Sequence, residues 1–151
     1  MKRLILLLAV FAATPALAAD GDYVVFDRSK VATLLHQCSR DTPPVGEAGW
    51  TPLAGDIMAM EAALPTVLTE QIRHRPAFAS APHGWIRQYV GIVRGGKRLI
   101  YGNFVPKGAG GDDGRWRREP IIVCDGGEAF FGAEYDVAAK TFTHVAFNGH
   151  V

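Results

Sequence analysis

The apolar residues of this chain change their spacing near residue 85, and this change restricts the fold more than any other feature of the sequence. Between residues 31 and 72 they recur every three or four positions, as on one face of a helix. Residues 86–93 and 98–105 are instead rich in β-branched and aromatic side chains. Gly95-Gly96 between them suits a tight turn that needs positive φ angles. The sequence therefore predicts helices first, followed by strands that pair as hairpins.

Two helices are predicted before this change. Asp27 or Ser29 can cap the first one. Its apolar stripe consists of Val31, Leu34, Leu35 and Cys38. Thr51-Pro52 provides a capping hydroxyl and a proline for the start of the second, whose stripe continues over residues 53–72. Because proline lacks an N–H group, Pro65 should kink this helix or divide it into two.

Five strands are predicted after the change, at residues 86–93, 98–105, 119–124, 129–135 and 142–147. Helices followed by strands that short turns connect are typical of an α+β domain. We expect N-terminal helices packed on one face of a roughly five-stranded antiparallel meander. This arrangement resembles the cystatin-like and NTF2-like layout. The resemblance implies a layout and no function, because such folds host enzymes, inhibitors and binding modules.

The first 18 residues have the pattern of a secretory signal peptide. Lys2 and Arg3 precede an apolar run at residues 4–13, and residues 16–18 form a small-x-small cleavage site. A run of about ten residues is too short for a membrane-spanning helix, which needs roughly twenty. We expect cleavage to leave a single α+β domain at residues 19–151, located in the periplasm or secreted, without a membrane span.

The two cysteines, Cys38 and Cys124, are predicted to form a disulfide, since an even number of cysteines in an oxidising compartment favours pairing. The alternative is that Cys124 is a nucleophile with a histidine as its base, for which the candidates are His36, His83 and His144. Export argues against a free thiol, so the disulfide is the preferred interpretation.

Basic residues concentrate in residues 73–118, which contain ten Lys or Arg and two Asp, whereas both flanking parts of the chain are acidic. This block predicts a surface that binds an acidic partner. The candidate residues are Arg94, Lys97, Arg98, Arg115, Trp116, Arg117 and Arg118. An alternative is that these cations only keep turns and strand edges solvated. Nucleic acid is an unsuitable partner, because the chain is close to neutral overall and is expected to be exported.

A second candidate site is a pocket between the sheet and the helices, lined by Arg87, Tyr89, Glu134 and His144. We assign no catalytic residue, cofactor or metal site. The histidines lack helix-spaced pairs, and the loop at residues 110–114 lacks the alternating ligands and final glutamate of an EF-hand.

Two functional hypotheses follow. The first is an exported, non-enzymatic binding or inhibitory module, of the type that includes immunity proteins, which recognises another macromolecule in the periplasm. The alternative is a small-molecule-binding protein or enzyme that uses the pocket between sheet and helices. The absence of a specific catalytic motif favours the first, and the sequence does not define the oligomeric state.

Overall fold

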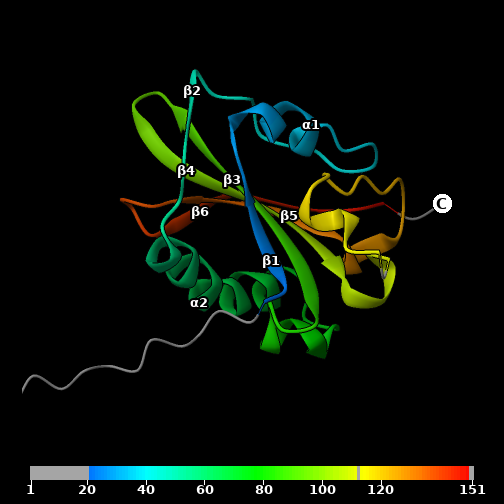
Figure 1. Cartoon of the computed structure of the whole chain (residues 1–151). Coiled ribbons are helices and arrows are strands. Elements are labelled where there is room, and N and C mark those ends of the chain that lie inside the picture. The colour runs from blue at the N-terminus through cyan, green and yellow to red at the C-terminus, as the bar shows by residue number, and fades with distance from the viewer. Residues whose placement is uncertain (1–20, 112, 150–151) are drawn as a thin grey trace, which may run out of the picture.

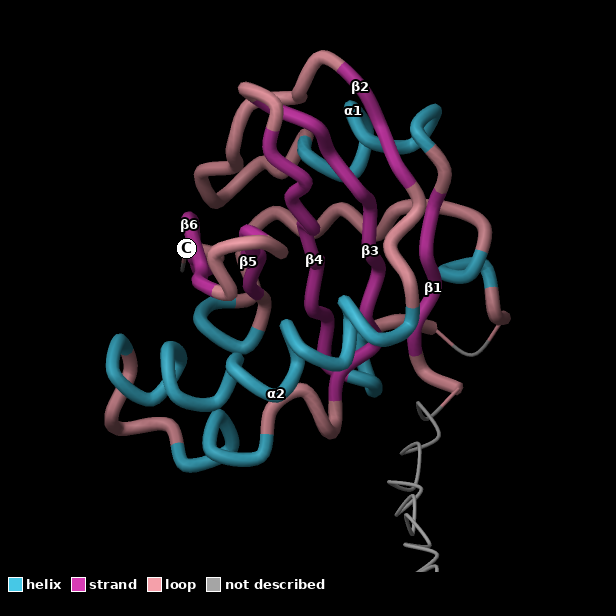
Figure 2. The backbone as a smooth tube through the Cα atoms, turned by 90° about the vertical axis from the view of Figure 1, so that its left-hand side faces the viewer, coloured by secondary structure: helices cyan, strands magenta, loops and turns pink. Residues whose placement is uncertain are grey.

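The computed structural model describes residues 21–111 and 113–149 of the chain, so the predicted signal peptide at residues 1–18 lies outside the described residues. The described part is an α+β structure with one mixed sheet. The strands are β1 (Tyr23–Phe26), β2 (Ala48–Trp50), β3 (Trp85–Arg94), β4 (Lys97–Pro106), β5 (Phe131–Asp136) and β6 (Thr141–Phe147). Their order is β1-β3-β4-β5-β6, and β2 also pairs with β3 (Figure 2).

The predicted hairpin is confirmed as the centre of the sheet. β3 and β4 pair antiparallel over their full length, up to Arg94 opposite Lys97. Gly95 and Gly96 form the turn with φ angles of 57° and 73°. Positive φ at both central residues is the geometry that a two-residue turn between twisted strands requires, which explains why glycine occupies both positions.

The expectation of a purely antiparallel meander is wrong, because β1 runs parallel to β3. Tyr23 lies opposite Arg87 in this pairing. β2 pairs antiparallel with the other half of the same edge, where Gly49 lies opposite Ile92. The two strands are four and three residues long, and neither reaches β3 through a tight turn. They therefore lack the alternation and the turn residues by which strands are recognised in a sequence.

The helices cover opposite faces of the sheet rather than one face, which corrects the predicted layering (Figure 1). α2 (Ala54–Gln71) packs its buried Met60 and Leu64 against Tyr89 and Phe104 of the sheet. α1 (Val31–Leu35) packs on the other face against a smaller cluster that includes Tyr101. We call these two surfaces of the sheet the α2 face and the α1 face.

Both helices differ in extent from the prediction. α1 ends at Leu35, so Cys38 lies beyond it in a loop and is exposed instead of belonging to a core-facing stripe. α2 continues through Pro65 as one helix. It begins after Leu53, whose backbone N–H donates to Asp56 Oδ2 at 3.2 Å. None of the helices in the described part of the chain is long and apolar enough to cross a membrane.

The predicted strand at residues 119–124 is also wrong, because this segment is irregular. It belongs to a long connection between β4 and β5. The connection contains three short 3-10 turns, η3 (Lys107–Ala109), η4 (Arg115–Arg117) and η5 (Gly127–Ala129). The backbone of this connection forms hydrogen bonds with side chains of the sheet and does not join the sheet as a strand.

Candidate functional site

The disulfide between Cys38 and Cys124 is confirmed, with a Cα–Cα distance of 5.1 Å. It connects the loop after α1 to the 119–124 segment, and both cysteines are exposed. Around the bridge, the backbone N–H of Asp125 donates to Ser39 Oγ at 2.9 Å, and the N–H of Gly149 donates to the carbonyl of Ser39 at 3.0 Å. The Cys124 thiol is therefore not a free nucleophile in this structure.

Asn148 connects the bridge region to the interior, a role that the sequence did not reveal. Its Nδ2 group donates to the carbonyls of Val123 and Asp125 at 2.9 and 2.6 Å. Its Oδ1 atom accepts from Nη1 of the buried Arg40 at 2.6 Å. The adjoining Gly149 marks a common turn dipeptide, so the sequence pattern could only indicate the end of a strand.

Gln88 of β3 and Asn103 of β4 hold the 119–124 segment on the α1 face. Gln88 Nε2 donates to the carbonyls of Trp116 and Glu119 at 2.7 and 2.8 Å. Gln88 Oε1 accepts from the backbone N–H of Ile121 at 2.8 Å, and Asn103 Nδ2 donates to the Ile121 carbonyl at 3.0 Å. Buried backbone groups need partners, and here two amide side chains provide them in place of a neighbouring strand.

The candidate site lies beside this segment, at residues 115–118, which we call the basic segment. Trp116, one of the candidate binding residues, is only 7% exposed, so it is buried and does not present its ring to a partner. The guanidinium of Arg117 lies 4.0 Å from the Trp116 ring centroid, within cation–π range. Arg115 contacts Asp113 at 3.8 Å, and both side chains are largely exposed. Arg117 and Arg118 are exposed, and neither has an ion pair within residues 21–111 and 113–149.

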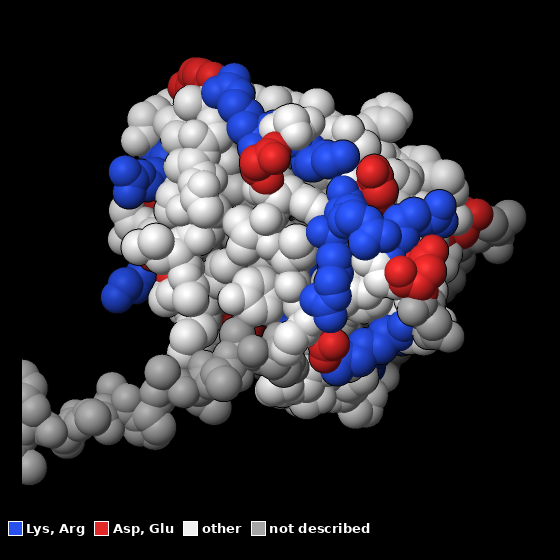
Figure 3. Space-filling view, in the orientation of Figure 1, with Lys and Arg blue, Asp and Glu red and all other residues white. Residues whose placement is uncertain are grey.

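Basic side chains gather over η3 and η4 on the face shown in Figure 3. The same connection forms a surface cleft of about 800 Å³. The cleft is lined by Ala109, Gly110, Gly111, Asp113, Arg115, Trp116 and residues 119–123. The basic segment thus borders a depression that is large enough for several residues of a partner.

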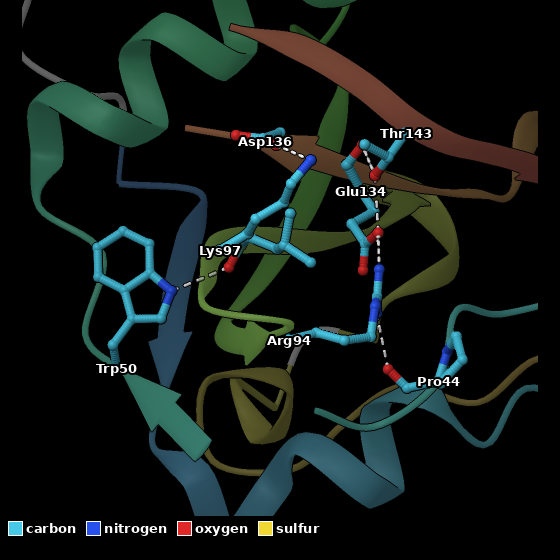
Figure 4. A network of polar contacts seen from close by, with 8 residues as sticks. Pro44, Trp50, Arg94, Lys97, Glu134, Asp136 and Thr143 are labelled. Atoms are coloured by element: carbon cyan, nitrogen blue, oxygen red, sulfur yellow. Dashed lines mark hydrogen bonds and ion pairs between the residues drawn. The ribbon is translucent and has the colours of Figure 1, made fainter. Parts of the chain in front are cut away.

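The basic residues at the hairpin turn have a different role from those of the basic segment. Figure 4 shows that Arg94 forms an ion pair with the buried Glu134 of β5, which also accepts from Thr143 Oγ1 at 2.7 Å. Lys97 lies 3.2 Å from the carboxylate of Asp136. The pKa of Asp136 is lowered, first by the backbone N–H of Ala139 and also by Lys97. Arg94 and Lys97 therefore neutralise buried carboxylates of β5.

Arg98 lies 5.4 Å from the ring centroid of Trp50, whose Nε1 donates to the Leu99 carbonyl at 3.0 Å. The basic block of the sequence is thus divided in space. Gln88, which bonds to Trp116, is six residues before Arg94 along β3, a separation of roughly 20 Å at about 3.3 Å per residue. The hairpin turn and the basic segment do not form one continuous patch.

The four residues of the predicted pocket are also divided. Tyr89 packs in the cluster under α2, and Arg87 shares its face because it lies two residues away on the same strand. Glu134 lies on the α1 face, and His144 opposite it on β6 contacts the Asp41 carbonyl through Nε2 at 3.0 Å. The convergence that would favour a small-molecule site at these residues is therefore not observed.

Glu61 of α2 joins Arg87 and Tyr89 in place of the two predicted partners. Tyr89 Oη donates to Glu61 Oε1 at 2.7 Å, and Arg87 Nη1 lies 3.4 Å from the same oxygen. Burial raises the pKa of Tyr89 well above 10.0 and also raises the pKa of Glu61. Glu61 was recognisable as an interruption of the apolar helix sequence, but its partners follow only from the packing of α2 on the sheet.

Within the described ranges 21–111 and 113–149, no group of three or more His, Cys, Asp or Glu residues could hold a metal ion. Comparison with known proteins gave no match to a family model, to a curated protein or to a solved structure.

Proposed function

We propose that the protein is an exported, non-enzymatic binding module that docks a negatively charged macromolecule on the basic segment 115–118. The observation that carries this proposal is the exposure of Arg117 and Arg118 without an ion pair among the described residues, beside a cleft of about 800 Å³. Export is inferred from the N-terminal sequence pattern, and a disulfide between exposed cysteines is compatible with an oxidising compartment.

The basic segment is held in place, which lowers the entropic cost of binding. Trp116 is buried, its carbonyl accepts from Gln88, and the N–H groups of Arg117 and Arg118 donate to Gly114 and Arg115 at 3.1 and 2.8 Å. The backbone beneath the cations is therefore already ordered before a partner arrives. Exposed cations increase the rate of association with an acidic partner and make binding sensitive to salt.

The experiment is affinity capture from a periplasmic extract at low salt, followed by titration calorimetry with the captured partner. We expect a stoichiometric partner whose binding is weakened at least tenfold by Arg117→Glu together with Arg118→Glu. The matched control is Arg73→Glu together with Lys140→Glu, which makes the same change in net charge at two exposed positions elsewhere and should bind normally.

Equal loss of binding in the control would show that only overall charge matters and would contradict docking at the basic segment. Failure to capture a partner, combined with thermal stabilisation by a compound from a metabolite library, would favour the alternative of a small-molecule-binding protein.

A further inference from the structure

The hydrogen bonds of the 119–123 stretch in the β4–β5 connection follow the alternation of an extended chain that is bonded on one side. The carbonyl of Glu119 accepts from Gln88, and Ile121 uses both its N–H and its carbonyl toward Gln88 and Asn103. The carbonyl of Val123 accepts from Asn148 Nδ2. Every second residue therefore directs its backbone groups toward the sheet.

The alternate residues direct their backbone groups the other way, because successive residues of an extended chain point to opposite sides. These groups are the N–H and carbonyl of Ile122 and the carbonyl of Pro120. No hydrogen bond to any of the three occurs within the described residues. Ile122 is 39% exposed, and it lines the cleft beside the basic segment. The stretch therefore presents a short free edge, comparable to the edge of a sheet.

We propose that this edge binds an extended acidic polypeptide by strand addition at Ile122. This inference rests on the proposed function and specifies the class of its partner. The N–H and carbonyl of Ile122 would form a hydrogen-bonded pair with one residue of the ligand, which is the main-chain recognition used in β-augmentation. Acidic side chains of the ligand would lie over Arg117 and Arg118.

The amide side chains beneath the stretch make it a suitable receptor. Four side chains fix its backbone through five hydrogen bonds, one of which runs from Gln37 Nε2 to the Ile121 carbonyl at 3.3 Å. The disulfide at Cys124 fixes the chain immediately after it. Binding a ligand therefore costs little entropy for ordering the receptor. Because the free edge is only about three residues long, the neighbouring cations are needed to raise the affinity.

The test uses a fluorescein-labelled peptide of four Glu-Val repeats, blocked at both ends, and the mature protein with its disulfide intact. Fluorescence anisotropy at low salt should show binding that Ile122→Pro weakens at least tenfold, because proline removes the N–H donor. Ile122→Val, which keeps the donor and the β-branched shape, should bind normally. In the ¹H–¹⁵N spectrum, peptide addition should slow hydrogen exchange of the Ile122 amide.

A second probe keeps the test valid if Ile122→Pro disturbs the fold. The same peptide with N-methyl groups on its four central residues carries the same charge but cannot donate from its centre, and it should bind the unaltered protein at least tenfold more weakly. Equal binding of the two peptides, weakened only by the Arg117→Glu and Arg118→Glu pair, would overturn strand addition and leave charge-based docking intact. Absence of peptide binding would overturn strand addition, while the extract experiment decides the proposed function separately.

Discussion

Replacing both Cys38 and Cys124 by serine should destabilise the protein mainly through its unfolded state. The bridge closes a loop with a sequence separation of 86 residues. The chain-entropy relation gives such a loop roughly 4 to 5 kcal/mol at 25 °C as an upper figure. Both cysteines are exposed, so the double variant loses little buried apolar surface. Ser39, Asp125 and Gly149 keep hydrogen bonds that join the two ends in the folded protein.

The assay is equilibrium unfolding in urea, followed by fluorescence of the tryptophans. For a domain of this size the slope m is about 2 kcal/mol per molar urea, so a loss of 4 kcal/mol lowers the midpoint by about 2 M. The slope should also rise in the variant, because an unfolded chain without the cross-link exposes more surface. The amide spectrum of the folded variant should change only near the two substituted positions.

Two results would refute this reasoning. A loss below about 1 kcal/mol with an unchanged slope would mean that the unfolded chain already keeps the two ends together, so the cross-link removes little entropy. A spectrum altered across the whole 119–124 segment would mean that the bridge, and not the amide side chains of the sheet, fixes that segment.

Two further predictions concern Gly132 and Asp136 of β5, which both lie on the α1 face. Gly132→Ala should destabilise the protein by about 1–3 kcal/mol in the same unfolding assay, because a Cβ atom there would lie 2.2 Å from Tyr101 Oη. Gly55→Ala near the start of α2, where a Cβ atom would meet no other part of the protein within 4 Å, should stabilise it by about 0.4–1 kcal/mol. An equal loss in both variants would contradict the steric explanation. The pKa of Asp136 in the folded protein is lowered from 3.8 by the Ala139 N–H and by Lys97. The ionised carboxylate therefore adds to the free energy of unfolding at pH values above the unfolded-state pKa, and this stabilisation is lost as the pH falls through the folded-state pKa. When the free energy of unfolding is measured from pH 7 to pH 2, it should fall more steeply with decreasing pH in the unaltered protein than in Asp136→Asn. The same pH dependence in both proteins would contradict this stabilisation.

The sequence allowed the longest elements to be predicted because their signals are local. α2 was recognisable from a sustained apolar stripe, and the β3–β4 hairpin from segments rich in β-branched and aromatic residues on either side of two glycines. The disulfide followed from the number of cysteines and the expected compartment. None of these inferences needed knowledge of which segments meet in space.

The remaining features depend on contacts between distant segments. β1 consists of four residues and is stabilised by parallel pairing to β3, whose opposite residues lie about 64 positions away, as for Tyr23 and Arg87. α1 lies on the face opposite α2 because the chain connections cross the sheet on different sides. The apolar pattern of each helix would be the same if both helices lay on one face, so the sequence does not distinguish the two arrangements. The register between neighbouring strands decides which face of the sheet each side chain occupies, and a single sequence does not define this register. It divides the residues of the predicted pocket between the two faces: Arg87, Tyr89, Glu134 and His144.

The failed prediction of a strand at residues 119–124 has an informative cause. Ile121, Ile122 and Val123 have the composition of a buried strand, but the sheet face beneath them carries Gln88 and Asn103 where a core would have apolar side chains. A buried amide is costly unless its hydrogen bonds are made, and these two make theirs with the backbone of the segment above.

A chain held in this way keeps the extended conformation that its composition favours, yet it lies on the sheet face and not at a sheet edge. Its inner backbone groups are satisfied by side chains, and the outer pair at Ile122 has no partner among the described residues. A strand in the interior of the sheet would have used the backbone N–H and carbonyl groups of both sides in hydrogen bonds with its neighbours. The same polar residues that make the sequence pattern misleading therefore account for the free edge beside the basic segment.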